Sequence, residues 1–170
     1  VDQSFREVDK DGKWYWTYGG DYGPKDVPSF GNFCCNGLVN AVREPHPHLL
    51  EVKKIYQNIK STLIDKKNLT VRVKNWFDFS DLNEYILHWK VTGDDGTVLA
   101  EGNKEVACEP HATVELTLGA VQLPKTIREA YLDLGWTRKK STPLVDTAWE
   151  IAYDQFVLPA SGKVWNGKPS

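Results

Sequence analysis

From Ser61 onward the chain consists of short runs in which apolar and polar residues alternate, and this period of two restricts its fold more than any other feature. In 69–74, for example, Leu69, Val71 and Val73 fall on one face of a predicted strand. Seven short strands within about 100 residues predict an immunoglobulin-like β-sandwich, a mainly β fold, rather than an α/β fold. The runs lie at 62–64, 69–74, 85–91, 97–99, 114–118, 130–136 and 151–158.

Turn signals and large apolar residues agree with this pattern. Gly93-Asp-Asp-Gly96 predicts a hairpin turn into the run at 97–99. We expect Trp89 and Trp136 in the core, because an indole is long enough to bridge two sheets about 10 Å apart.

Residues 1–60 show no such regularity. Asp9-Lys-Asp-Gly12 predicts a turn between two short extended pieces, and 16–38 is rich in glycine, proline and aromatic residues without any period. A helix is predicted over 45–59, since two prolines suit its start and an apolar stripe follows. The stripe consists of Leu49, Val52, Ile55, Tyr56 and Ile59. We therefore predict two parts, 1–60 and 61–170, and expect the first to fill a surface of a neighbouring domain.

Composition narrows the class of protein. Hydrophobic residues make up 41% of the chain, the net charge is -2, and basic residues are scattered, which argues against nucleic-acid or anionic-membrane partners. No apolar run approaches the roughly 20 residues that span a bilayer. Because the chain begins at Val1 and has no methionine, we expect it to be a piece of a longer polypeptide of unassigned compartment.

We predict that the three cysteines, Cys34, Cys35 and Cys108, are reduced buried thiols. Reduced thiols favour a cytoplasmic parent protein. A nucleophile built from Cys34 or Cys35 with His46 or His48 has no third group to orient it.

Four sequence blocks then occur in one order and at consistent spacing. They are Val1-Asp-Gln-Ser4, Tyr18-Gly-Gly-Asp-Tyr-Gly23, Asn32-Phe-Cys-Cys-Asn-Gly-Leu38 and Arg43-Glu-Pro-His-Pro47. These blocks resemble the end of the catalytic barrel in glycoside hydrolase family 2 β-galactosidases, and Leu87-His-Trp89 resembles the sandwich domain that follows it. The resemblance implies that 1–60 is the tail of a (β/α)8 barrel, with its last βα loop and last helix, and that 61–170 is the immunoglobulin-like domain.

The resemblance also implies a site. In the family, the backbone carbonyl at Phe33 and the side chain of Asn36 help bind a monovalent cation beside the galactose, and the Phe33 ring lines the sugar pocket. It implies sodium, with magnesium elsewhere in the parent enzyme, and no ion held tightly by this piece alone. From the residues alone, Asn36 can equally cap the turn before Gly37. The family often has an acidic residue where this chain has Phe30.

The catalytic residues are expected elsewhere. Hydrolysis with retention needs two carboxyl groups about 5 Å apart, and in the family both are glutamates on earlier barrel strands. We therefore expect the parent to hydrolyse terminal β-D-galactosides and this piece to be inactive. Asp21 is expected to accept backbone N–H groups in its turn. Expected partners are the remaining barrel and flanking domains, with a homo-oligomeric parent and self-association of the isolated piece.

Two alternatives come from other classes of protein. A free carbohydrate-binding module would use Trp14 and Trp16, or Trp165, as a stacking platform. A structural immunoglobulin-like domain would carry 1–60 as an extension without function. His46 and His48 can bind a metal, but we expect them to cap and pack at a helix start.

Overall fold

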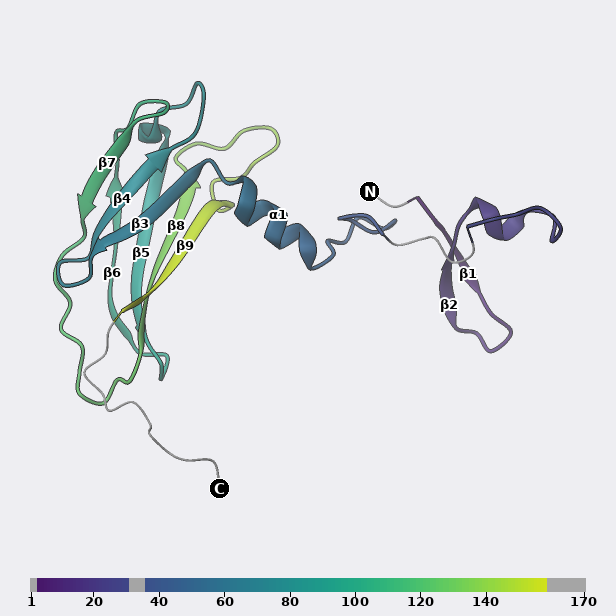
Figure 1. Ribbon diagram of the computed structural model, residues 1–170, viewed down its shortest axis with the longest axis horizontal. Coiled ribbons are helices and arrows are strands. Elements are labelled where there is room, and N and C mark those ends of the chain that lie inside the picture. Colours follow the sequence, from purple (N-terminus) through teal and green to yellow (C-terminus); the bar gives the residue numbers. More distant parts are fainter. Residues whose placement is uncertain (1–2, 31–35, 159–170) are drawn as a thin grey trace. The chain divides into compact units, whose positions relative to one another are not determined.

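The computed structural model describes residues 3–30 and 36–158, and the chain forms two compact units, Val1–Tyr56 and Gln57–Ser170 (Figure 1). The N-terminal unit contains β1 (Phe5–Val8), β2 (Trp14–Thr17), a 3-10 helix (Gly19–Tyr22) and α1 (His48–Tyr56). The second unit, called the sandwich unit below, contains β3 (Ile59–Asp65), β4 (Thr70–Asn75), β5 (Tyr85–Gly93), β6 (Val98–Glu105), β7 (Thr113–Thr117), β8 (Ala130–Arg138) and β9 (Glu150–Leu158).

The seven strands of the sandwich unit form two antiparallel sheets, one in the order β3-β4-β7 and the other in the order β6-β5-β8-β9. The chain leaves the first sheet after β4, builds β5 and β6 in the second, and returns so that β7 pairs with β4. Such a Greek-key return is typical of immunoglobulin-like sandwiches. The predicted mainly β sandwich is confirmed.

The core lies between the two sheets and is built from the alternating residues that the sequence predicts. Val71 and Val73 of β4 face Leu87 of β5 and Leu132 of β8 in one cluster of buried side chains. Trp136 is fully buried, as expected. Each buried valine or leucine of the cluster stabilises the fold by about 1.5–3 kcal/mol when it is removed from water.

Trp89 differs from the prediction, because it is only partly buried and packs against the margin of the core. Its partner in the neighbouring edge strand is Gly102. A Cβ atom at Gly102 would lie 3.0 Å from the indole, so the Trp89 ring covers a position where the edge strand has no side chain.

Hydrogen bonds close the open side of the sandwich, where β3 and β9 approach each other. A carboxylate oxygen of Asp154 accepts from the Ser61 backbone N–H at 2.8 Å, and Gln57 Oε1 accepts from the Tyr153 N–H at 3.2 Å. Gln57 is buried. These side chains satisfy backbone groups that a strand edge otherwise leaves unpaired.

The helix is shorter than predicted. It covers His48–Tyr56, directly after Pro47, whereas Ile59 belongs to β3 and is buried. Gln57 is held by the sandwich and the β3 ladder begins two residues later, which takes Ile59 out of the helical stripe. No residue of α1 is buried, and Leu50, Ile55 and Tyr56 are more than half exposed.

The N-terminal unit begins with a hairpin of β1 and β2, as the turn signal predicts. Asp9 Oδ1 accepts from the backbone N–H groups of Asp11 and Lys13, both at 2.9 Å. Gly12 has φ +79°, a conformation that glycine adopts without strain. Among the described residues of this unit, 3–30 and 36–56, only Thr17 is buried.

Candidate functional site

The Gly-Gly-Asp-Tyr stretch forms a single 3-10 turn directly after β2. Asp21 Oδ2 accepts from the Tyr18 N–H at 2.9 Å, and the Asp21 N–H donates to the Tyr18 carbonyl at 3.0 Å. The prediction that Asp21 serves its own turn is confirmed. A Cβ atom at Gly20 would collide with the Tyr18 ring, which explains a glycine at this position.

Tyr22 ties this turn back to the hairpin. Its hydroxyl lies 2.5 Å from Thr17 Oγ1 and donates to Glu7 Oε1 at 2.9 Å. Its ring meets the Phe5 ring edge to face, with centroids 5.9 Å apart. Tyr22 is nevertheless 55% exposed and Phe30 is 84% exposed, so most aromatic surface of this segment faces outward.

A second turn follows over 37–46 and carries part of the third and fourth sequence blocks. Val39 and Pro45 form an isolated antiparallel bridge that closes it. Asn40 organises the interior: its Oδ1 accepts from the N–H groups of Val42 at 3.0 Å and Glu44 at 2.9 Å, and its Nδ2 donates to Glu44 Oε2 at 2.9 Å. Arg43 adopts φ +73° at the tip.

Asn36, the predicted cation ligand, lies directly before this turn and is exposed. No hydrogen bond joins its side chain to another described residue, and the turn is capped by Asn40 instead. The Gly37 carbonyl is already paired with His46 Nδ1 at 2.5 Å. A neutral amide oxygen such as that of Asn36 is a type of ligand that suits a hard monovalent cation.

Sequence reasoning overlooked Asn40. The signal was present in the spacing of Asn40 and Glu44, because a short polar side chain four residues before an acid can hold a tight loop at both ends. Phe33, the other predicted ligand, lies outside the described residues, as do Cys34 and Cys35.

The remaining cysteine and the histidines behave as structural residues. Cys108 is a free, buried thiol, and burial raises its pKa, which keeps it protonated. His46 and His48 lie with their rings 5.6 Å apart near the start of α1. Within 3–30 and 36–158, no three His, Cys, Asp or Glu residues gather in a way that could hold a metal ion.

The tryptophans of the hairpin contact one another. Trp14 and Trp16 meet edge to face with centroids 5.5 Å apart, and the Arg6 guanidinium lies 4.3 Å from the Trp14 ring centre. This arrangement covers part of the flat surface that sugar stacking would need. Trp165 lies outside the described residues.

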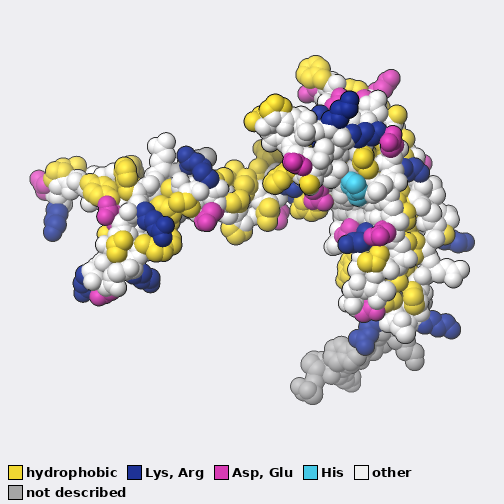
Figure 2. Space-filling model, turned by 180° about the vertical axis from the view of Figure 1, so that it is seen from behind, with side chains coloured by type: hydrophobic (Ala, Val, Ile, Leu, Met, Phe, Trp, Pro, Cys, Tyr) yellow, Lys and Arg dark blue, Asp and Glu magenta, His cyan; other side chains and the backbone are white. Residues whose placement is uncertain are grey.

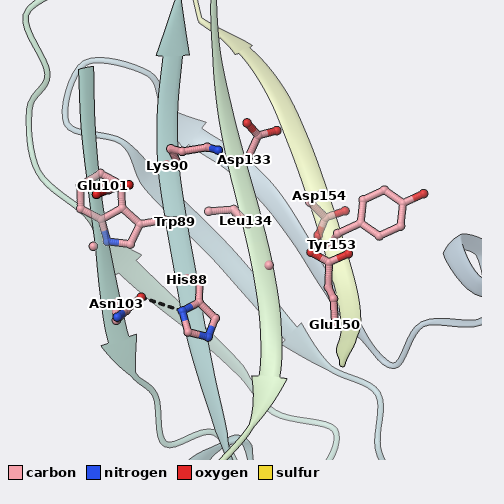
Figure 3. Close-up of a pocket in the computed structure, with 12 residues that line it drawn as sticks. His88, Trp89, Lys90, Glu101, Asn103, Asp133, Leu134, Glu150, Tyr153 and Asp154 are labelled. Atoms are coloured by element: carbon pink, nitrogen blue, oxygen red, sulfur yellow. Dashed lines mark hydrogen bonds between the residues drawn. The ribbon is translucent and has the colours of Figure 1, made fainter. Parts of the chain in front are cut away.

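A polar groove of about 780 Å³ runs over the four-stranded sheet (Figure 3). His88 is fixed on its floor by Asn103 Oδ1 at 2.7 Å and Thr137 Oγ1 at 2.9 Å. Asp133 accepts from Gln155 at 2.7 Å, and Asp154 anchors β3. Two of the carboxylates that line the groove are thus engaged in structural hydrogen bonds, which favours a supporting role for them.

No helix in the described part of the chain is long and apolar enough to cross a bilayer.

Comparison with known proteins gives two family matches that divide the chain. The family model for domain 4 of β-galactosidase matches residues 71–159, just over half of the chain. The model for the TIM barrel domain of glycosyl hydrolases family 2 matches residues 1–61.

Curated relatives agree with these models. A β-galactosidase of Aeromonas hydrophila is 35% identical over 162 residues, covering 94% of this chain and 15% of that protein. Those of Klebsiella pneumoniae strain 342 and Priestia megaterium are 36% and 37% identical over 161 residues, with the same coverage. The chain thus spans about 15% of the length of the curated relatives it matches.

A solved family 2 β-glucuronidase covers 60% of this chain at 18% identity and a TM-score of 0.35, too low to support an argument about function. The two family models and the relatives together are decisive, and the chain belongs to the glycoside hydrolase family 2 β-galactosidases.

Proposed function

We propose that this chain is the part of a β-galactosidase that ends the catalytic barrel and supplies the sandwich domain after it. The parent enzyme hydrolyses terminal β-D-galactosides with retention, and the two glutamates that act as acid and nucleophile lie on barrel strands outside this chain. Alone, the 170 residues are inactive. The observation that carries this proposal is the match of 1–61 to the family 2 barrel, in a unit whose described residues bury no hydrophobic side chain.

Within the parent, the N-terminal unit forms the rim of the active site, where barrel enzymes gather their functional groups. Asn36 provides an amide oxygen and Phe33 a backbone carbonyl to a sodium ion beside the galactose. The ion supplies positive charge at the sugar, and an anionic ligand comes from another part of the barrel. Asn40 and Glu44 hold the turn that follows Asn36, and so keep its amide in place.

The sandwich unit braces the barrel without chemistry of its own, and the hydrogen bonds of Asp133 and Asp154 hold its own strands together. The parent is a homo-oligomer, and any magnesium it uses binds outside this chain. The isolated chain self-associates through the uncovered surface of its N-terminal unit.

The test is a chromogenic assay on the full-length enzyme and on the 170-residue chain. The full-length enzyme should cleave o-nitrophenyl β-galactoside, while the chain gives no turnover above blank. An enzyme that ignores β-galactosides but cleaves a β-glucuronide or a β-mannoside would overturn the substrate class.

Asn36→Ala in the full-length enzyme tests the cation ligand. We expect the sodium concentration for half-maximal activity to rise about tenfold, as the loss of roughly 1.4 kcal/mol of binding free energy requires. Asn58→Ala is the matched control, because Asn58 is also exposed and lies in the sandwich unit. An unchanged sodium dependence for Asn36→Ala removes Asn36 from the site.

A further inference from the structure

Two loops extend from the same end of the sandwich unit, 76–84 between β4 and β5 and 139–149 between β8 and β9. The register fixes this, because Tyr85 pairs with Arg138 at the start of β5 and Ile59 pairs with Asn75 at the start of β3. The chain therefore enters the sandwich at the end from which both loops project (Figure 1).

These loops expose large hydrophobic side chains, which we call the apolar end and define as Trp76, Phe79, Leu144 and Trp149. Phe79 is 96% exposed and Leu144 is 94% exposed, while the two tryptophans are more than half exposed. Figure 2 shows hydrophobic side chains protruding at the upper end of the sandwich unit. Single exposed apolar residues are ordinary, but several at one end of a domain mark an interaction surface.

The loop that carries Phe79 is held in shape by a buried asparagine. Asn75 is fully buried, and its Nδ2 donates to the carbonyls of Ser80 and Cys108, both at 2.9 Å. Its Oδ1 accepts from the Phe77 N–H at 2.9 Å, and the Phe77 ring stacks on Tyr85. Phe79 is thus presented by an ordered loop.

Leu144 is presented in a similar way. Thr142 Oγ1 accepts from the N–H groups of Leu144 at 3.3 Å and Val145 at 3.0 Å, and the Thr142 N–H donates to the Val145 carbonyl at 2.8 Å. Two preorganised tips lose little conformational entropy when they dock, which raises the affinity that their apolar area can give.

Several acidic side chains around the apolar end have a basic side chain beside them. Asp78 lies 2.9 Å from His111, Glu84 lies 3.2 Å from Arg138, and Glu105 lies 2.7 Å from Lys139. Apolar tips within a polar rim that contains ion pairs match the anatomy of a protein interface. A nucleic acid or an anionic membrane would instead require an excess of basic residues.

We propose that the apolar end docks on the barrel domain of the full-length β-galactosidase and fixes the sandwich domain against it. This inference rests on the proposed function, since it needs the parent enzyme. We choose the barrel as the docking partner because of the chain connection. The segment matched to the barrel, 1–61, runs directly into β3 at this end, and most of the relatives' length lies outside the matched region. A tethered neighbour has an effective concentration of about millimolar, which favours it over a free partner.

Hydroxyl-radical labelling with mass spectrometry compares the isolated chain with the full-length enzyme. Labelling of Phe79 and Leu144 should be at least fivefold lower in the full-length enzyme. Val98, half exposed at the opposite end of the sandwich, is the matched control and should be labelled equally in both. Equal labelling of Phe79 and Leu144 in both proteins overturns the proposal.

The labelling is repeated over a hundredfold range of protein concentration, with the oligomeric state measured by light scattering. Protection that does not change as the oligomer dissociates places the contact within a single enzyme chain, as docking on its own barrel requires. Protection that disappears on dilution assigns it to a second copy and contradicts the proposal.

The double variant Phe79→Ser, Leu144→Ser gives a second readout. It should lower the Tm of the full-length enzyme by several degrees and leave the Tm of the isolated chain unchanged, whereas Val98→Ser changes neither. Galactosidase activity of the wild-type enzyme separates the two hypotheses. An active enzyme with unprotected tips refutes the docking alone, and an enzyme inactive on galactosides refutes the proposed function whatever the labelling shows.

Discussion

The two units of this chain differ in what their aromatic residues do. In the sandwich unit, Trp136 and Tyr85 are buried among aliphatic side chains. In the N-terminal unit, Phe5, Tyr22 and Phe30 are all more than half exposed, although the hairpin and both turns are well hydrogen-bonded. Local hydrogen bonds can therefore shape a segment without giving it a core.

This contrast indicates how each unit obtains its stability. The sandwich unit gains free energy from buried apolar area, which is the dominant favourable term in folding. The N-terminal unit has turn chemistry but, in its described residues, almost no buried area to offset the conformational entropy that ordering costs. Such a segment is suited to be covered by a larger domain, as the family's barrel would cover it.

The largest expected effect comes from the centre of the sandwich. Trp136→Ala should lower the free energy of unfolding by about 3–5 kcal/mol, because it removes transfer free energy and leaves a cavity. Trp14→Ala, in the hairpin, should cost less than about 0.5 kcal/mol, as at surface positions generally. Urea denaturation of both variants measures the difference, and equal costs would show that the hairpin has a core of its own.

Asn75→Ala should have the next largest effect. It removes the acceptor of the Phe77 N–H and one donor to each of the Ser80 and Cys108 carbonyls, and an unsatisfied buried group costs about 1–3 kcal/mol. We expect the urea midpoint to fall and exchange of the 76–81 amides to accelerate. Asn58→Ala is the control. If it lowered the urea midpoint as much as Asn75→Ala does, the hydrogen bonds of Asn75 would not be the cause of the effect.

Asn40→Ala tests the turn chemistry of the N-terminal unit. The Val42 and Glu44 amides lose their acceptor, so their hydrogen exchange should accelerate severalfold, while the unfolding midpoint of the sandwich stays constant. Hydrogen-exchange rates of these two amides, measured by NMR in both proteins, test the prediction. A lowered midpoint would mean that the two units are energetically coupled.

The smallest expected effect is a dependence on acid pH confined to the sandwich turns. Hydrogen bonds, chiefly from the Asn68 side chain, hold the pKa of Asp65 below its ordinary value, and the Thr97 N–H does the same for Asp95. Because these pKa values are lowered in the folded state, their contribution is present above the ordinary value of 3.8 and is lost as pH falls below it.

Urea midpoints measured from about pH 6 to about pH 2.5 should therefore fall less in Asp65→Asn, Asp95→Asn than in the wild type. An identical acid dependence in both proteins would contradict the assignment. Trp76 and the hairpin residues are not involved, so their exchange should not follow this titration.

The sandwich could be predicted from the sequence because alternation and turn residues act locally. Leu132, Leu134 and Trp136 had to share a face, and Gly96 had to permit the turn, with φ +83°. The helix end was not predictable in this way. Ile59 continues the helical stripe, and only its tertiary role in β3 removes it from α1.

The candidate site was predictable only through the resemblance. Neither composition nor spacing distinguishes Asn36 as a ligand from Asn36 as a turn cap, and its role as a ligand stays a prediction. The structure adds that Asn40 makes hydrogen bonds within the following turn. The apolar end escaped prediction as well, since Phe79 reads as an ordinary apolar residue until its near-complete exposure is known.

The central claim is that the N-terminal unit lacks a core because the enzyme's barrel covers it. Hydrogen exchange of 3–30 and 36–56, measured in the isolated chain and in the full-length β-galactosidase, tests this most directly. Outside the amides held in the hydrogen-bonded turns, we expect exchange in the isolated chain to be near the unfolded rate, and slower by at least a hundredfold in the enzyme. Equal protection in both, with the sandwich strands protected throughout, would contradict the account.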